Sequence, residues 1–153
     1  MNALTDLFSL DRIALDNPSK SRAEAFAAAG ALFAKQVGLE ADAVVGFLNA
    51  REDLGSTALG AGVAIPHGRV KGLKQPIAAF LKLKEAIEFA APDGEAVSTL
   101  IFLLVPEKAT QQHLEILSSI AQLLSDPDAR KALSSEGNPG RVCNLLQTWG
   151  THS

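Results

Sequence analysis

His67 is the side chain of this sequence best placed for chemistry, because its neighbours shape the backbone instead of filling a core. It lies between Pro66 and Gly68, after a short apolar run over 63–65 that reads as a strand cut off by the proline. A neutral imidazole is a competent nucleophile near neutral pH, and its attack on a phosphoryl group gives a reactive phosphoramidate. The setting predicts an exposed, rigidly held histidine whose chemistry needs no metal and no nucleotide.

Phosphoryl transfer at this histidine requires hydrogen-bond donors around the phosphoryl oxygens, and nearby residues supply candidates. Arg51 offers a planar, charged fork. His113 falls in the first turn of a predicted helix, where free amides and the helix dipole favour an anion and a neutral imidazole. The glycine-rich stretch 55–62 lets amides approach closely and adds hydroxyl groups, so its candidate phosphoryl-binding residues are Ser56, Thr57, Gly60 and Gly62.

Other familiar signatures are missing from the sequence. Gly55 and Gly60 have the spacing of a nucleotide-binding P-loop, but Ala61 and Gly62 follow where that loop requires Lys and then Ser or Thr. The dinucleotide-binding fingerprint also fails, since Ile65 replaces its third glycine. There is no serine-hydrolase elbow, and the three histidines lack metal-ligand spacing. We therefore expect neither a metal nor a bound cofactor.

Each candidate also has a purely structural interpretation. A histidine in a turn is usually a solvated surface residue, a first-turn histidine often belongs to a helix cap, and loop glycines often only turn the chain. The helix end at 51–53 is by default solvated. Cys143 is most simply a small core side chain, and His152 lies near the C-terminus, where chains fray. Residue types and spacing alone leave the site a hypothesis.

Helix and strand patterns alternate along the chain. Ser21 and Glu24 form a capping box that predicts a helix ending near Gly38, and apolar spacing predicts further helices over 41–49, 110–124, 127–133 and 139–149. Thr110 is the expected N-cap of the helix that holds His113. Apolar runs predict strands over 63–65, 77–83 and 97–105, the last one central and covered on both faces. This mixture predicts a single α/β sandwich.

Composition agrees with one globular domain over residues 1–153. Hydrophobic residues make up 47% of the chain and charged residues 20%, which excludes general disorder. The net charge is −3, there is no run of Lys or Arg, and tyrosine is absent, so nucleic acid is not an expected partner. With one cysteine and neither a signal sequence nor a long apolar segment, the sequence predicts a cytoplasmic protein without membrane insertion.

Residues 51–69, REDLGSTALGAGVAIPHGR, closely resemble the signature of the type-2 enzyme IIA domain of the bacterial phosphoenolpyruvate-dependent phosphotransferase system, of the fructose and mannitol class. Leu103–Pro106 followed by His113–Ser118 looks like the second site segment of this family. The resemblance covers about residues 4–149. Within the family the sequence is most similar to the nitrogen-branch regulatory members, which are free-standing IIA proteins.

The resemblance implies a fold, a site and a phosphoryl donor. The implied fold is an α/β single-domain sandwich with a mixed, mostly five-stranded sheet covered by helices. His67 is implied as the phosphoryl acceptor through Nε2, His113 as an orienting donor and Arg51 as a clamp, with Ser56, Thr57 and the glycines lining the site. The implied donor is a small histidine phosphocarrier protein, itself charged by an enzyme I type kinase, and no cofactor is implied. In one departure, Ala90 stands where the resemblance implies an aspartate, which puts loop contacts in doubt.

Three functions fit these observations. The leading hypothesis is a regulatory phosphocarrier of the nitrogen branch, with transferase-class chemistry through a phosphohistidine that carries about two negative charges and changes which proteins bind. The family suggests potassium transport or sensor kinase components as regulatory targets. The alternative is the IIA component of a fructose- or mannitol-type sugar permease that passes its phosphoryl group to a IIB domain, although no IIB segment is attached here. The third is an interaction module without phosphotransfer, which the intact Arg51, His67 and His113 disfavour.

Overall fold

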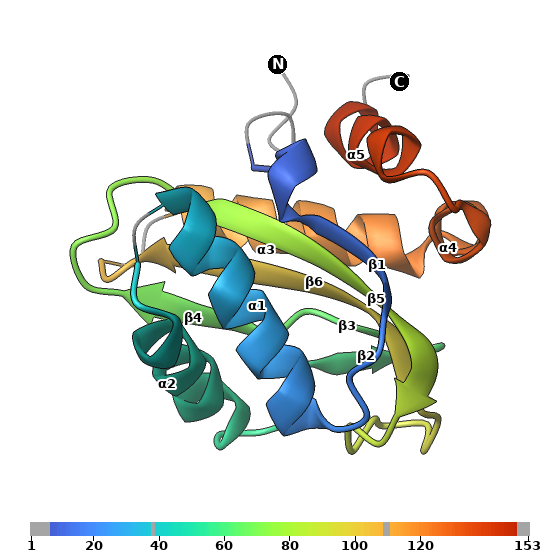
Figure 1. Ribbon diagram of the computed structural model, residues 1–153, viewed down its shortest axis with the longest axis horizontal. Coiled ribbons are helices and arrows are strands. Elements are labelled where there is room, and N and C mark those ends of the chain that lie inside the picture. The colour runs from blue at the N-terminus through green and yellow to red at the C-terminus, as the bar shows by residue number, and fades with distance from the viewer. Residues whose placement is uncertain (1–6, 38, 109–110, 150–153) are drawn as a thin grey trace.

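The chain forms one twisted sheet with helices on both faces, shown by the computed structural model (Figure 1). The structure describes residues 7–37, 39–108 and 111–149. Its helices are η1 (Leu10–Arg12), α1 (Arg22–Val37), α2 (Ala41–Glu52), α3 (Gln111–Ser125), α4 (Pro127–Ser135) and α5 (Pro139–Thr148). Its strands are β1 (Ile13–Asn17), β2 (Ala58–Gly60), β3 (Val63–Ala64), β4 (His67–Val70), β5 (Ile77–Ile87) and β6 (Val97–Pro106). In this part of the chain no helix is both long and apolar enough to cross a membrane.

The six strands occupy five positions in the sheet. Their order is β1-β5-β6-β3-β2, and β4 also pairs with β6. Both β3 and β4 run parallel to β6, with Ala64 opposite Leu100 and His67 opposite Leu103, so the two short strands continue each other along one edge of β6. The β1–β5 pair is also parallel, whereas β5–β6 and β2–β3 are antiparallel. The expectation of a mixed, mostly five-stranded sheet covered by helices is confirmed.

Strand β6 lies at the centre of the molecule, as its continuous apolar sequence predicts. Its residues from Thr99 to Val105 are all buried, because helices cover both faces of the sheet. Figure 1 shows α1 and α2 in front of the sheet and α3 behind it. Two separate apolar clusters result, one on each face.

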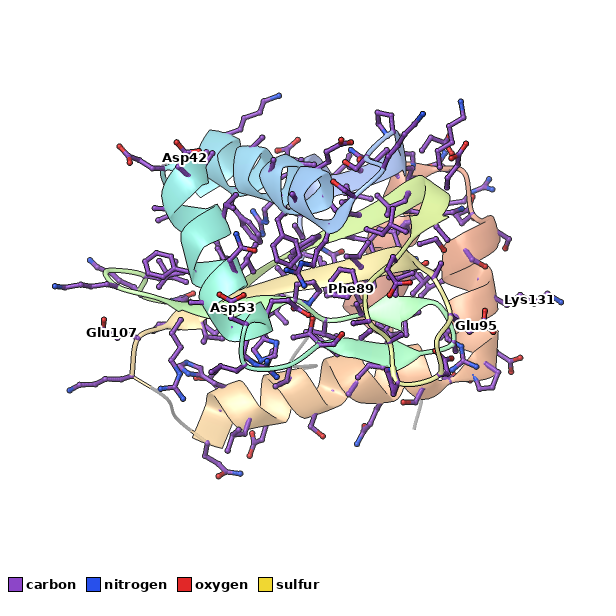
Figure 2. The ribbon with its side chains drawn as sticks, turned by 90° about the horizontal axis from the view of Figure 1, so that it is seen from below. Asp42, Asp53, Phe89, Glu95, Glu107 and Lys131 are labelled. Atoms are coloured by element: carbon purple, nitrogen blue, oxygen red, sulfur yellow. The ribbon has the colours of Figure 1, made fainter. Side chains whose placement is uncertain are left out.

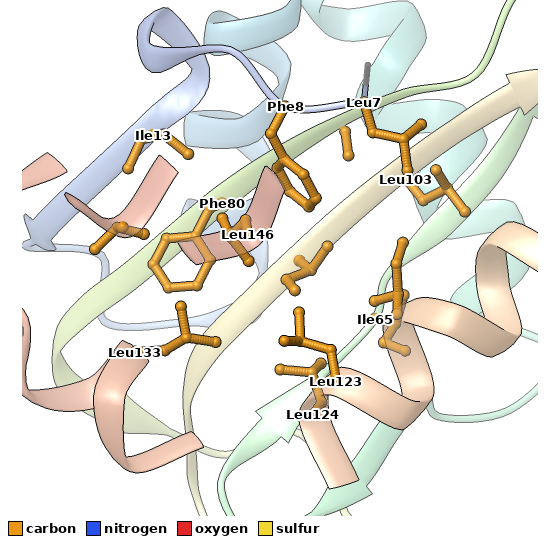
Figure 3. Packing of buried hydrophobic residues seen from close by; sticks show 14 of the residues in the cluster. Leu7, Phe8, Ile13, Ile65, Phe80, Leu103, Leu123, Leu124, Leu133 and Leu146 are labelled. Atoms are coloured by element: carbon orange, nitrogen blue, oxygen red, sulfur yellow. The ribbon is translucent and has the colours of Figure 1, made fainter. Parts of the chain in front are cut away.

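The cluster on the α3–α5 face joins sheet side chains to the three C-terminal helices. Figure 3 shows Phe80 and Leu103 of the sheet facing residues of these helices, namely Leu123, Leu124, Leu133 and Leu146. On the other face, Phe26 of α1 contacts Phe102 of β6 edge-on, with ring centroids 5.8 Å apart. Each face therefore has its own core, and the sheet is the layer that the two cores share.

Most predicted elements are present, with differences at their ends. The capping box is confirmed at Ser21, whose Oγ accepts the Glu24 amide at 3.1 Å, although the Glu24 carboxylate accepts from the amide of Lys20 at 2.9 Å. Helix α2 continues three residues past the predicted end at Asn49, and 58–60 is a strand within the predicted loop. Gly38, Thr110 and His152 lie outside the described residues. Ala90 adopts φ +55°, and its amide donates to Glu88.

Candidate functional site

A pocket of about 630 Å³ opens where α2 ends, β4 begins and α3 begins. Its basic lining residues are Arg51, His67, Arg69 and His113, and none of the described residues that line it is acidic. Its apolar lining includes Phe47, Leu54, Leu103, Val105, Leu114 and Leu117. The fold therefore brings together the three residues predicted to act on a phosphoryl group, although they come from three separate elements.

A close approach between α2 and β4 places Arg51 near His67. A Cβ atom on Gly68 would lie 3.0 Å from the carbonyl oxygen of Phe47 and 3.1 Å from its carbonyl carbon. Only glycine lets the helix backbone come this near the strand without displacement. Because Arg51 lies one turn after Phe47, the contact at Gly68 sets the distance of the guanidinium from the site.

The imidazole of His67 has two ring nitrogens with different roles. Its Nδ1 lies 2.8 Å from the carbonyl oxygen of Ile65. A carbonyl can only accept a hydrogen bond, so in the neutral ring Nδ1 carries the proton and Nε2 keeps its lone pair. His67 lies in the pocket as the first residue of β4, not in a turn after a strand. The lone pair available on the neutral ring is therefore on Nε2.

The surroundings of His67 lower the pKa of its imidazole below the ordinary value of 6.5. Burial is the main cause, because it disfavours the charged ring, and the positive charge of Arg51 acts in the same direction. The hydrogen bond to Ile65 and the negative charge of Glu52 oppose the shift. At neutral pH the ring is therefore uncharged, as a nucleophile requires.

The guanidinium of Arg51 is held by the loop that follows α2. Its Nη1 donates to the carbonyl oxygen of Gly55 at 2.9 Å. Gly55 adopts φ +148°, a conformation that side-chain-bearing residues rarely take. Arginine has five N–H donors in a planar fork, and this bond uses one of them. The anchored fork matches the requirements of an anion clamp.

Glu52 is buried, which the sequence interpretation of a solvated helix end missed. Only 5% of the residue is exposed, whereas the next residue, Asp53, is exposed after the end of α2 (Figure 2). Oε2 of Glu52 accepts the amide of Thr57 at 2.8 Å, and Oε1 accepts its hydroxyl at 2.7 Å. A signal was present in the sequence, because Glu52 continues the spacing of four residues between the buried Val44 and Leu48.

The predicted phosphoryl-binding residues of the glycine-rich stretch lie outside the pocket lining. The Ser56 hydroxyl donates to the carbonyl oxygen of Phe89 at 2.8 Å, and the Thr57 hydroxyl is bonded to Glu52. Gly60 at the end of β2 and Gly62 in the turn before β3 adopt φ +95° and +80°. In the structure, all four residues shape or stabilise the stretch between α2 and β3. Their role as phosphoryl ligands stays a prediction.

Arg69 is a pocket residue to which sequence reasoning gave no role. Alternate residues of a strand point to the same face, so Arg69 follows His67 onto the pocket side of β4. Around the opening, Leu54 and Leu114 are 83% and 62% exposed, while Val70 at the end of β4 is buried. We call Leu54 and Leu114 the apolar rim. Among the described residues, no group of three His, Cys, Asp or Glu side chains is placed to hold a metal ion.

Fold and site together define an α/β sandwich with an arginine and two histidines around one pocket beside its sheet. The family described as phosphoenolpyruvate-dependent sugar phosphotransferase system, EIIA 2, has a model that matches residues 6–149, so the chain belongs to this family. The resemblance stated from the sequence is confirmed.

Relatives within the family include nitrogen regulatory proteins. The chain is 36% identical over 143 residues to one from Bradyrhizobium diazoefficiens, covering 94% of both chains. It is 51% identical over 88 residues to one from Pseudomonas aeruginosa, which covers 58% of this chain and 57% of that protein. The crystal structure of nitrogen regulatory protein IIA-Ntr from Neisseria meningitidis superposes with a TM-score of 0.90 at 41% identity, covering 95% and 99% of the two chains. These similarities support a role as a phosphotransferase-system IIA protein.

Proposed function

We propose that this chain is a regulatory phosphocarrier of the nitrogen branch, reversibly phosphorylated on Nε2 of His67 and acting through phosphorylation-dependent protein binding. The observation that carries the proposal is the 2.8 Å contact between Nδ1 and the Ile65 carbonyl, in a pocket that also contains Arg51 and His113. The contact leaves Nε2 as the nucleophile, and the basic lining suits a phosphoryl group. The similarity to nitrogen regulatory proteins supports the regulatory branch.

In the proposed transfer, the lone pair of Nε2 attacks the phosphorus atom of a phosphohistidine on the donor protein. A new N–P bond forms on His67 while the donor's N–P bond breaks, and its electron pair returns to the donor nitrogen. The donor ring, protonated on its other nitrogen, then leaves as neutral imidazole. Nδ1 of His67 keeps its proton throughout, and the Ile65 carbonyl stabilises the positive charge that the ring gains.

Arg51 and His113 are assigned to the phosphoryl oxygens. Arg51 acts as the clamp, because its planar fork can bind two oxygens while Gly55 holds it in place. His113 acts as an orienting donor from the first turn of α3, where the helix dipole favours an anion. The phosphoryl donor is a small histidine phosphocarrier protein, itself charged by an enzyme I type kinase, and the apolar rim is its contact surface. Regulatory targets are potassium transport or sensor kinase components.

The test is transfer from phosphoenolpyruvate through purified enzyme I and histidine phosphocarrier proteins of the nitrogen and sugar branches, followed by intact mass at alkaline pH. We expect acid-labile phosphorylation of the wild type, faster with the nitrogen-branch carrier and absent in His67→Ala with an unchanged circular dichroism spectrum. A label that persists in His67→Ala would contradict the assignment of the acceptor.

The alternative function is the IIA component of a fructose- or mannitol-type permease, and the family's own description as a sugar phosphotransferase system favours it. It predicts equal or faster charging by the sugar-branch carrier and onward transfer to a IIB domain. The same assay separates the two functions. Absence of charging by either carrier, with the protein folded, would leave only an interaction module.

A further inference from the structure

The ladder between β2 and β3 is incomplete at its last pair, next to His67. The two strands are antiparallel, with Ala58 opposite Ala64. One step further, the amide of Ile65 donates to the carbonyl oxygen of Thr57 at 3.1 Å. In a regular antiparallel ladder such a pair exchanges two bonds, so the amide of Thr57 should donate back to the carbonyl oxygen of Ile65.

Two side chains replace that returning bond. The amide of Thr57 donates instead to Oε2 of Glu52 at 2.8 Å. The carbonyl oxygen of Ile65, which the ladder leaves without this amide, accepts from Nδ1 of His67 at 2.8 Å. Glu52 at the end of α2 thus accepts from the donor of the missing strand-to-strand hydrogen bond. His67 at the start of β4 donates to its acceptor.

We propose that Glu52 is a positioning residue that sets the tautomer of His67: by binding the amide of Thr57, it reserves the Ile65 carbonyl for Nδ1 of His67. This inference rests on the proposed function, because the tautomer decides which nitrogen receives the phosphoryl group. Glu52 touches neither the phosphoryl group nor the donor in this account. It acts only through Thr57 and Ile65.

The burial of Glu52 supports this assignment over a purely structural one. Val44 and Leu48 precede it on the same buried stripe of α2, where a further apolar residue would avoid the cost of burying a carboxylate. The carboxylate is also oriented to use both oxygens on Thr57, at 2.7 and 2.8 Å. The Ile65 carbonyl oxygen has two lone pairs. Without Glu52, however, the amide of Thr57 would compete with the imidazole of His67 for this oxygen.

The experiment compares Glu52→Met with Glu52→Gln in the full chain. Methionine fills the same space but cannot accept the Thr57 amide, whereas the glutamine oxygen can. Nitrogen-15 NMR of the His67 ring reports the proton on Nδ1 or Nε2, and single-turnover transfer from the charged carrier at saturating concentration reports the rate. Glu52→Asp, which withdraws the carboxylate by one methylene group, is the second variant if Glu52→Met does not fold.

We expect the wild type and Glu52→Gln to hold the proton on Nδ1. Glu52→Met should hold the proton mainly on Nε2 and transfer at least about tenfold more slowly, because that tautomer has no lone pair on Nε2. Retention of a single Nδ1–H tautomer in both Glu52→Met and Glu52→Asp would overturn the proposal. A slower rate without any change of tautomer would overturn it as well.

Asn138→Ala is the matched control for lost stability. Asn138 caps α5 on the other face of the sheet, where its side chain accepts the amides of Gly140 and Arg141 at 2.8 and 3.2 Å. This variant should lower the melting temperature and leave the tautomer intact, and a tautomer change in it would contradict a specific role for Glu52. If the wild type accepts no phosphoryl group, the proposed function fails, while the NMR comparison still decides the role of Glu52.

Discussion

At the scale of single residues, two effects act on the imidazole of His67, which we propose as the phosphoryl acceptor. The hydrogen bond from Nδ1 to Ile65 determines which nitrogen carries the proton. Burial and the charge of Arg51 keep the ring uncharged at neutral pH. The first effect depends on the backbone carbonyl of Ile65, whereas the second comes mainly from burial, and the same hydrogen bond partly opposes it.

The pKa of His67 gives a direct prediction. An NMR titration should place it below 6.5, and Arg51→Gln should raise it because a positive charge that disfavours the imidazolium is removed. The measurement follows the ring carbon-bound protons of His67. A pKa above 6.5 in the wild type would contradict the burial argument.

The same shift predicts how stability depends on pH. The unfolded ring titrates near 6.5 and the folded ring below that value, so as pH falls through this window the unfolded chain takes up protons first. Stability from this residue is therefore present above 6.5, falls as pH decreases, and stops falling below the folded pKa. Urea unfolding of the wild type should show this loss of stability as the pH falls. The loss should be smaller in His67→Asn, which lacks the titrating ring.

At the scale of elements, the contact between α2 and β4 gives a prediction about packing. Gly68→Ala should force the helix backbone at Phe47 away from the strand, since the new Cβ would lie 3.0 Å from a carbonyl oxygen. We expect a loss of about 1–3 kcal/mol in the free energy of unfolding, as for other overpacked sites. Transfer to His67 should also slow, because Arg51 moves with the helix.

Gly46→Ala is the matched control for this prediction. Gly46 lies in the same helix, and a Cβ there would meet nothing within 4 Å. Alanine should stabilise an exposed helix position by up to about 1 kcal/mol. Urea unfolding and the transfer rate measure both variants. Equal effects of the two substitutions would show that the approach at Gly68 is unimportant.

Sequence patterns predicted the long elements and the short strand at 63–65, and missed the other short strands for a physical reason. Helices and the central strand β6 carry their own periodicity, which is a local property. No strand was expected at Ile13–Asn17, and β4 has only four residues; these two strands pair with β5 and β6, far along the chain. Strand β2 has three residues, too few to show a periodic pattern. Glu52 was missed although its spacing places it on the buried stripe of α2, because a carboxylate is buried at low cost only with a partner such as Thr57, which the fold supplies.

At the scale of the whole molecule, the pocket is basic although the chain is acidic overall. The net charge is −3, yet Arg51 and Arg69 both line the pocket. A phosphoryl group brings about two negative charges, which these two arginines would balance. The residue types at the pocket were predictable from a long motif. The charge contrast between the pocket and the rest of the surface could not be predicted without the fold, because the fold brings α2, β4 and α3 together.

The apolar rim gives a prediction about binding of the phosphoryl donor. Leu54→Asp and Leu114→Asp should each raise the carrier concentration needed for half-maximal transfer, at a cost of about 1–2 kcal/mol in binding. The rate at saturating carrier should stay near that of the wild type, because neither side chain contacts the reacting atoms in our proposal. Steady-state transfer kinetics measure both quantities.

Leu10→Asp is the control for the rim. Leu10 is also exposed, at 55%, but lies in η1 and does not line the pocket. Its substitution should leave the half-maximal concentration unchanged. If Leu10→Asp weakens transfer as much as the rim substitutions do, a general effect of added negative charge would replace the rim as the explanation.

The described ends of the fold are joined by a direct hydrogen bond. Gln147 of α5 donates from Nε2 to the carbonyl oxygen of Phe8 at 2.9 Å, and neither residue lines the pocket. Neighbouring ends favour circular permutation, because a short linker can join them while new ends are opened in an exposed turn such as 92–95. The same proximity makes this fold easy to insert as a module within a longer polypeptide, since both connections leave from one place and the pocket stays accessible.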